Sequence, residues 1–175
     1  MTSPLDPLQL LGDILADNGL SAALIGGHAV NAWAEPRFTA DIDITVAADA
    51  DAIERVRQDL LARGYRIVRE VGAELPSGPD FLRLVRGSDD PPIDLQIAKT
   101  SFQEEVIRRA RPGRPPIATP EDLIVLKLIA HRPKDLLDLR NLILLNDLDW
   151  DYIEGWADAW EVRQRLDTLR TADSS

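Results

Sequence analysis

The sequence predicts an α/β protein (α+β in some classifications) in which helices pack with a sheet and a small helical part follows. In the first 110 residues, short strand-like segments with an apolar period of two alternate with segments of helical period. After a proline-rich stretch, only helical patterns remain. A chain of 175 residues with 45% hydrophobic residues can fill one core. We therefore expect a sheet core over residues 1–110 and a helical part over residues 111–175 packed on it as one compact unit.

Capping residues and periodicity place the elements of the first part. Asp6-Pro7 suits an N-cap followed by proline at the first helical position, and Gly64 suits a helix stop. YRIVREV and FLRLVR alternate apolar with charged residues and are joined by a Gly- and Pro-containing segment, which predicts a hairpin. The expected order is a helix from Asp6 to Asn18, a strand at 21–25, a helix at about 28–34, a strand at 41–46, a helix at about 51–63, strands at 65–71, 81–86 and 91–98, and a helix begun by Thr100 or Ser101.

The second part begins with the segment RPGRPPIATP, in which four prolines and a glycine predict a hinge. Thr119-Pro120 then starts a helix, since a capping hydroxyl, a proline and two acids follow one another. The continuation LIVLKLIA is apolar almost all round, which predicts burial on most sides. Further helices are expected from Pro133 and from Trp150 to Arg170, with Trp150, Trp156 and Trp160 as packing anchors before a disordered TADSS tail.

Composition restricts the chemistry. The chain has no cysteine and only two histidines, His28 and His131, so thiolate and zinc sites are disfavoured and any metal must be held by oxygen. No stretch approaches the ~20 apolar residues of a membrane span, and the N-terminal segment lacks a signal-peptide pattern, so we expect a cytoplasmic protein without a membrane partner.

The charge is unevenly distributed. A net charge of −10 argues against a broad polyanion-binding surface. Residues 99–140, however, carry nine Lys or Arg against six acids. Solvated helix faces often produce such counts, but a basic middle segment would also suit a nucleotide or an RNA end.

A pair of glycines and a pair of aspartates carry the clearest chemical signal. Gly26-Gly27 follows the predicted strand SAALI, and it allows a sharp turn that brings backbone N–H groups close to a phosphate. Fourteen residues after Gly27, the period of two in DIDITV places Asp41 and Asp43 on one strand face. Two adjacent carboxylates are unfavourable without a cation, and Mg²⁺ takes carboxylate oxygens together with substrate phosphates.

Each motif alone has a plainer interpretation. A lone Asp-x-Asp is more often a solvated strand edge, and an isolated Gly-Gly is more often a simple strand-to-helix turn. The combination at this spacing, with Arg37 and Thr39 just before the acids, is more specific. PPIDLQIA adds Asp94 on the polar face of a later strand, where it either faces solvent or supplies a third acid.

Gly26-Gly27, Ala29 and the pattern Arg37-x-Thr39-x-Asp41-x-Asp43 resemble the nucleotidyltransferase superfamily that includes DNA polymerase β, and within it the minimal bacterial type. The resemblance implies the nucleotidyltransferase fold, with a mixed, twisted sheet flanked by helices. It further implies that the helix after the glycines positions a triphosphate, that the Asp-x-Asp binds two divalent metals (Mg²⁺ or Mn²⁺), and that Asp94 is the third ligand. His28 departs from the pattern, which usually has a small residue or Thr there.

The segment ATPEDLIVLKLIAHRPKDLLDLRNL resembles the second half of the AbiEii-like nucleotidyltransferases, which include abortive-infection and toxin–antitoxin proteins. The whole resemblance covers roughly residues 20 to 145. It implies that Lys127 and the pair Lys134-Asp135 lie near the nucleotide. From the residues alone, Lys127 either snorkels to the surface or reaches a polar pocket where a phosphate or an acid offsets its charge.

We therefore expect transfer of NMP from an NTP to an RNA (such as tRNA) or protein acceptor, with a cognate antitoxin or toxin as a candidate partner. Asp41, Asp43, Asp94 and Lys127 would be catalytic, with Gly26, Gly27, Arg37, Thr39, Lys134 and Asp135 binding the nucleotide. The alternatives are an aminoglycoside- or lincosamide-type antibiotic nucleotidyltransferase, which a small acidic cleft would favour, a non-catalytic nucleotide-binding or antitoxin module, and a plain interaction domain.

Overall fold

The computed structural model describes residues 6–172, which form two compact units. Of the described residues, the first unit comprises 6–28 and 38–118, and the second comprises 29–37 and 119–172. Helix α2 (Gly26–Val30) contains the junction after residue 28. The first unit holds α1 (Pro7–Asp17), β1 (Ser21–Ile25), β2 (Ile42–Ala47), α3 (Ala50–Ala62), β3 (Arg66–Val71), β4 (Phe81–Val85), β5 (Ile93–Ile97) and α4 (Ser101–Arg109).

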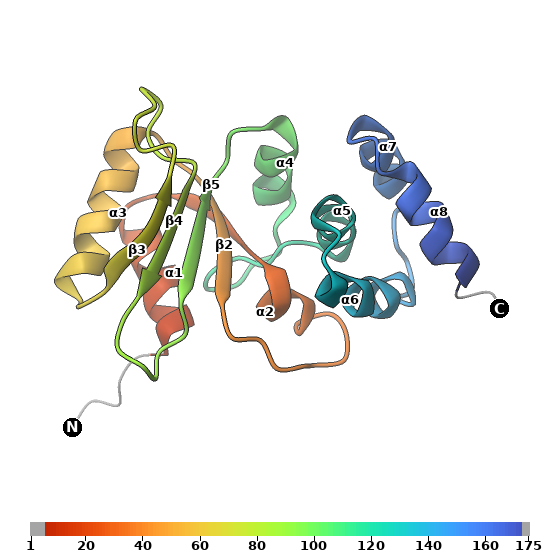
Figure 1. The fold of residues 1–175 in the computed structure, drawn as a ribbon, viewed down its shortest axis with the longest axis horizontal. Coiled ribbons are helices and arrows are strands. Elements are labelled where there is room, and N and C mark those ends of the chain that lie inside the picture. Colours follow the sequence, from red (N-terminus) through yellow and green to blue (C-terminus); the bar gives the residue numbers. More distant parts are fainter. Residues whose placement is uncertain (1–5, 173–175) are drawn as a thin grey trace. The chain divides into compact units, whose positions relative to one another are not determined.

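The five strands form one mixed sheet in the order β1-β2-β5-β4-β3 (Figure 1). β2 and β5 run parallel, and the other neighbouring strands are antiparallel. β3 and β4 pair as the predicted hairpin. The expectation of an α/β fold with a mixed sheet flanked by helices is confirmed.

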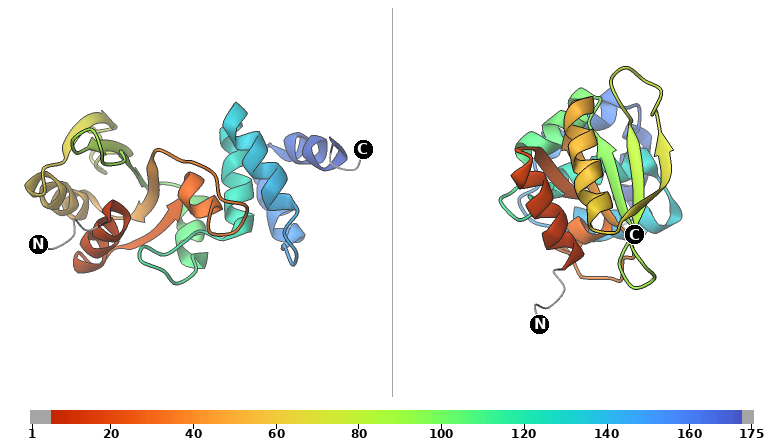
Figure 2. Two further views of the ribbon diagram at one scale, coloured as in Figure 1. Left: turned by 90° about the horizontal axis from the view of Figure 1, so that it is seen from below. Right: turned by 90° about the vertical axis from the view of Figure 1, so that its left-hand side faces the viewer.

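One face of the sheet supplies the core of the first unit. Alternate apolar residues of β2, β4 and β5 are buried, because successive strand side chains point to opposite faces. The helices α1, α3 and α4 lie on this side of the sheet (Figure 2, right). The polar residues of the same strands are therefore left on the opposite face.

Local sequence signals account for the helix boundaries of this unit. Asp6 caps α1 by accepting a hydrogen bond from the backbone N–H of Leu8, and Thr100 forms a capping box with Gln103 at the start of α4. Two boundaries differ from expectation. Helix α2 begins at Gly26 rather than at about residue 28 and ends at Val30, and Asp41 lies just before β2 rather than within it.

The second unit contains α5 (Pro120–Ala130), α6 (Pro133–Ile143), α7 (Trp150–Ala159) and α8 (Arg163–Ala172). Thr119 caps α5 as expected, and α5 is buried along most of its length. The single helix expected from Trp150 to Arg170 is two helices, because the backbone takes a left-handed conformation at Glu161 (φ 56°).

Of the three tryptophans expected as packing anchors, Trp150 and Trp156 are half-buried and make ring contacts with Arg170 and Tyr152, so only Trp160 departs from the expectation. Ile153 and Ala157 are the buried residues of α7, whereas Trp160 is 38% exposed. Thr171 and Ala172 of the tail that was expected to be disordered complete α8, and residues 173–175 lie outside the described residues. In the described part of the chain, no helix has the length and apolar character of a membrane span.

Candidate functional site

The parallel pairing of β2 with β5 brings two of the predicted acids together. Asp43 and Asp94 are register partners, so their side chains project from neighbouring strands on the same face of the sheet. Both carboxylates are half-buried. Asp41 lies one residue before β2 and is also half-buried.

A cationic side chain outside the predicted motifs links two of these acids. Arg83 on β4 is the antiparallel register partner of Asp94. Its Nη1 lies 2.9 Å from Asp94 Oδ2, and its Nη2 lies 3.0 Å from Asp41 Oδ1. The guanidinium therefore neutralises part of the charge that the clustered acids create.

Gly26 closes the other side of the acidic cluster. Its φ of +66° is in the left-handed region, and a Cβ added there would lie 2.1 Å from Asp43 Oδ2 and 2.8 Å from Asp43 Cβ. Glycine is thus needed twice, for the turn from β1 into α2 and for the close approach of the Asp43 carboxylate.

Gly26→Ala should destabilise the protein by about 2–3 kcal/mol, because left-handed strain is combined with a collision against Asp43. Gly87→Ala is the matched control, since Gly87 has a φ of +65° and nothing within 4 Å of an added Cβ. It should cost only about 1 kcal/mol. Urea unfolding of both variants measures the difference, and equal costs would show that Asp43 does not need the space at Gly26.

The acids suit a divalent cation chemically, because carboxylate oxygens are the donors that Mg²⁺ and Mn²⁺ prefer. Residues 6–172 show no ready-made group of three or more His, Asp or Glu side chains that could hold an ion. The guanidinium of Arg83 lies on two of the carboxylates instead. By donor chemistry the carboxylates of Asp41, Asp43 and Asp94 suit a metal, but in this arrangement Arg83 occupies two of the three.

Gly27 and Thr39 are the remaining predicted site residues of the first unit. Gly27 is buried and Thr39 is half-buried. The side chain of His28 has a buried Nε2 without a hydrogen-bond partner. Burial lowers the pKa of His28, and the charge of Asp6 only partly opposes this, so the neutral imidazole is favoured.

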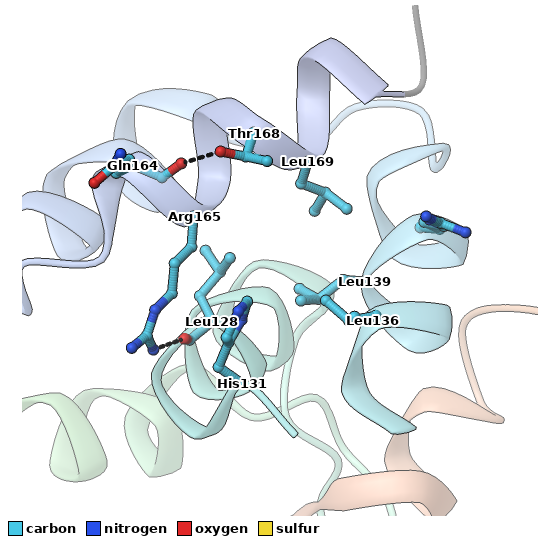
Figure 3. A pocket seen from close by; sticks show the side chains of 9 residues that line it. Leu128, His131, Leu136, Leu139, Gln164, Arg165, Thr168 and Leu169 are labelled. Atoms are coloured by element: carbon cyan, nitrogen blue, oxygen red, sulfur yellow. Dashed lines mark hydrogen bonds between the residues drawn. The ribbon is translucent and has the colours of Figure 1, made fainter. Parts of the chain in front are cut away.

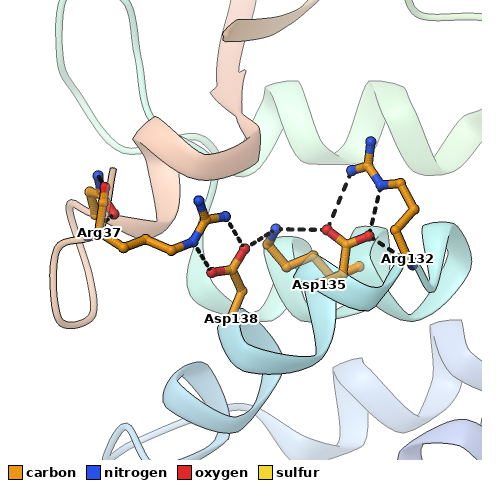
Figure 4. A network of polar contacts seen from close by, with 6 residues as sticks. Arg37, Arg132, Asp135 and Asp138 are labelled. Carbon is orange, nitrogen blue, oxygen red and sulfur yellow. Dashed lines mark hydrogen bonds and ion pairs between the residues drawn. The ribbon is translucent and has the colours of Figure 1, made fainter. Parts of the chain in front are cut away.

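A second charged cluster lies within the helical unit (Figure 4). Lys127 of α5 is 4% exposed, and its Nζ lies 2.6 Å from Asp138 Oδ2 and 3.2 Å from Asp135 Oδ1. Arg37 forms a two-pronged ion pair with Asp138, at 2.6 Å for both contacts, and Arg132 pairs with Asp135. The five side chains form a chain of alternating charges.

The alternating charges explain how two aspartates remain ionised inside the unit. Burial raises the pKa of both Asp135 and Asp138, but hydrogen bonds and charges from Arg132, Arg37 and Lys127 outweigh it and lower both values. Lys127 thus does not snorkel to the surface, because buried acids offset its charge. Lys134, which directly precedes Asp135 in α6, is exposed.

The predicted site residues therefore fall into two groups. Gly26, Gly27, Thr39 and the three acids belong to the first unit, and Arg37, Lys127, Lys134 and Asp135 to the second. Arg83 was missed in the sequence, and Arg132 and Asp138 were not among the predicted site residues. The alternation of apolar and charged residues in FLRLVR places Arg83 on the polar face of its strand, but the long turn that follows does not fix its register with Asp94.

The helical unit also contains a cavity of about 400 Å³ between α5, α6 and α8 (Figure 3). Arg165 donates a hydrogen bond to the carbonyl oxygen of Leu128 at its edge. The nine lining residues, none of which is a carboxylate, are Leu128, His131, Leu136, Leu139, Arg140, Gln164, Arg165, Thr168 and Leu169.

Comparison with solved structures defines the class of this fold. The structure of ANT(2'')-Ia in complex with adenylyl-2''-tobramycin is 18% identical, with a TM-score of 0.60 over 90% of this chain and 96% of the other. An antigenic nucleotidyltransferase-like protein from Paracoccidioides brasiliensis is 16% identical, with a TM-score of 0.51 over 93% and 89%. The lincosamide antibiotic adenylyltransferase LnuA, bound to lincomycin, is 18% identical, with a TM-score of 0.50 over 75% and 91%.

At these identities the likeness is one of fold, and the predicted nucleotidyltransferase fold is confirmed. Residues 100–173 match the model of a family described as nucleotidyltransferase of unknown function (DUF6036). No curated protein matches the chain in a sequence comparison. The matched family is described as a nucleotidyltransferase family, and the structural neighbours share the nucleotidyltransferase fold.

Proposed function

We propose that the protein is a metal-dependent nucleotidyltransferase that moves NMP from an NTP to an acceptor and releases pyrophosphate. The observation that carries this proposal is the pairing of Asp43 with Asp94 on neighbouring parallel strands, with Gly26 against Asp43. Asp41 belongs to the same cluster, because Arg83 forms ion pairs with both Asp41 and Asp94.

The first unit supplies the proposed chemistry. Asp41 and Asp43 would hold Mg²⁺ or Mn²⁺, and Asp94 would complete the ligand set on the side of the acceptor hydroxyl. When bound, the divalent ions would orient the α-phosphate and offset the charge that develops during transfer. Gly26 and Gly27 would offer backbone N–H groups to the β- and γ-phosphates at the turn into α2.

We further propose that Arg37, Thr39, Lys127, Lys134 and Asp135 take part in nucleotide binding, as the family resemblance implies. Within the second unit, Arg37 and Lys127 also have a packing role, because each forms ion pairs with a buried aspartate. The exposed Lys134 has the charge and the accessibility to meet a phosphate.

An RNA such as tRNA, or a protein, is the acceptor that we propose first. A toxin–antitoxin role with a cognate partner follows from the resemblance to AbiEii-like proteins. Antibiotic modification is the second candidate, and the likeness to ANT(2'')-Ia and LnuA favours it. The cavity of the helical unit does not match a polycationic aminoglycoside, because its described lining carries two arginines and a histidine but no carboxylate.

Incubation with each labelled NTP and Mg²⁺, in the presence of total tRNA, cell protein, tobramycin or lincomycin, tests these acceptors directly. Label transferred to tRNA or protein supports the first candidate, and label on a drug supports the second. NTP binding without transfer to any acceptor would leave the nucleotide-binding module as the function.

The double variant Asp41→Asn, Asp43→Asn should lose metal-dependent NTP binding, because two anionic ligands become neutral amides. Calorimetric titration with an NTP and Mn²⁺ should show at least a tenfold weaker affinity than that of the unmodified protein. Asp51→Asn, in α3 and outside the cluster, is the control and should bind normally. Unchanged binding by a folded double variant would refute the metal site.

A further inference from the structure

Four charged residues form a row across the polar face of the sheet. Arg69 pairs in register with Arg83, Arg83 with Asp94, and Asp94 with Asp43. Register partners on neighbouring strands point to the same face and lie close enough to interact. Two cations thus stand next to two anions, and Arg83 is at the boundary between them.

The guanidinium of Arg83 is bound specifically to the acids. Its Nη1 contacts both carboxylate oxygens of Asp94, at 2.9 and 3.2 Å, while its Nη2 contacts Asp41 at 3.0 Å. Arg69 makes a different contact, with its Cζ 5.7 Å from the ring centroid of Phe81. Arg83 is therefore the cation that links two of the three proposed metal ligands.

These contacts conflict with metal binding at the same carboxylates. A carboxylate oxygen that accepts a hydrogen bond from a guanidinium presents less charge to a metal, and two cations near one carboxylate repel each other. Arg83 must therefore leave Asp41 and Asp94 before those oxygens serve as ligands. Its side chain is 32% exposed, so this movement does not require the core to open.

We propose that Arg83 is a positioning residue that holds Asp41 and Asp94 in place in the nucleotide-free protein. When the nucleotide binds, the Arg83 guanidinium exchanges these carboxylates for hydrogen bonds to the triphosphate. The planar fork of N–H donors suits both partners, because carboxylate and phosphate oxygens accept paired hydrogen bonds in the same way. The exchange keeps the charge balanced, since the acids gain divalent ions as the guanidinium gains phosphate oxygens. This inference rests on the proposed function.

Titration of the nucleotide-free protein with Mn²⁺, followed by electron paramagnetic resonance, tests the first half of the exchange. Arg83→Gln should bind Mn²⁺ about tenfold more tightly than the unmodified protein, because the competing cation is gone. Arg69→Gln removes a charge from the next strand and should change the affinity less than about twofold. Arg83→Lys, which keeps the charge but loses the fork, should lie between the two and remains informative if the glutamine variant does not fold.

The second half is tested with ATP, GTP, CTP and UTP, each in saturating Mn²⁺. Arg83→Gln should bind the preferred NTP about tenfold more weakly, opposite in direction to its effect on Mn²⁺ alone. A merely structural arginine would not produce these opposite changes.

The outcomes separate this inference from the function on which it rests. One outcome is that the unmodified protein binds Mn²⁺ and that the Arg83→Gln variant, or Arg83→Lys in its place, has no higher Mn²⁺ affinity. The role of Arg83 is then overturned and the metal site stands. If Arg83→Gln binds Mn²⁺ more tightly but the NTP equally well, the transfer to the triphosphate is overturned. If neither the unmodified protein nor any folded variant binds Mn²⁺, the proposed metal site fails together with the inference.

Discussion

Lys127→Met should lower the free energy of unfolding by about 3–5 kcal/mol, because it removes one partner from a buried cluster of ion pairs. The Lys127 ammonium lies 2.6 Å from Asp138 and 3.2 Å from Asp135, and the side chains of both aspartates are at most 1% exposed. From the sequence, an apolar helix offered no structural reason for this lysine, and the methionine variant would have been expected to keep its stability. The acids of α6 reverse that expectation.

Urea unfolding at pH 7 measures the loss, with Lys134→Met as the control. Lys134 is exposed on the neighbouring helix, so its replacement should change the unfolding free energy by less than about 0.5 kcal/mol. If Lys127→Met unfolds like the unmodified protein but binds NTP more weakly, the ammonium serves the nucleotide and not the buried acids.

The same comparison has a predicted pH dependence. The pKa values of Asp135 and Asp138 are lowered in the folded protein, where hydrogen bonds and cations outweigh the effect of burial. The stability that they contribute is present above their ordinary pKa of about 3.9 and is lost as the pH falls through the lower folded value. The difference between Lys127→Met and the unmodified protein should therefore shrink as the pH falls below about 4.

Asp94→Asn should lower turnover about 100-fold or more while changing NTP affinity less than about threefold. The proposed role of Asp94 is to complete the ligand set at the acceptor hydroxyl, so its charge matters more during transfer than during nucleotide binding. Asp94 pairs in register with Asp43, and Arg83 forms ion pairs with both Asp94 and Asp41. This position supports the proposed role.

Steady-state kinetics with the acceptor that the labelling experiment identifies, together with NTP titration, check this prediction. Asp89→Asn is the control, because Asp89 is an exposed acid in the turn between β4 and β5. It should leave both quantities unchanged. An equal loss of affinity and turnover in Asp94→Asn would place Asp94 with the nucleotide ligands instead of the acceptor side.

Much of the local structure was predictable because its causes lie within a few residues of each other. Thr100 and Gln103 define the start of α4, and Asp6 defines that of α1, through capping hydrogen bonds that span at most three residues. The alternation of apolar and polar residues placed Asp43 and Asp94 on the polar face of their strands. The helix end near Glu161 was not predicted. The helix stops there because Glu161 takes a left-handed backbone conformation, which helix ends more often place at glycine or asparagine.

The sequence by itself determined the helices, the strands and the combination of two glycines with an acidic motif, because backbone sterics, capping and side-chain period act locally. Only the tertiary structure decided which charges meet. Arg83 reaches Asp41 and Asp94 because β4 pairs with β5 in one particular register, and Lys127 is stabilised by acids of the following helix. Ion pairs require only proximity, and strand register and helix packing create that proximity between residues whose positions in the chain give no direct sign of it.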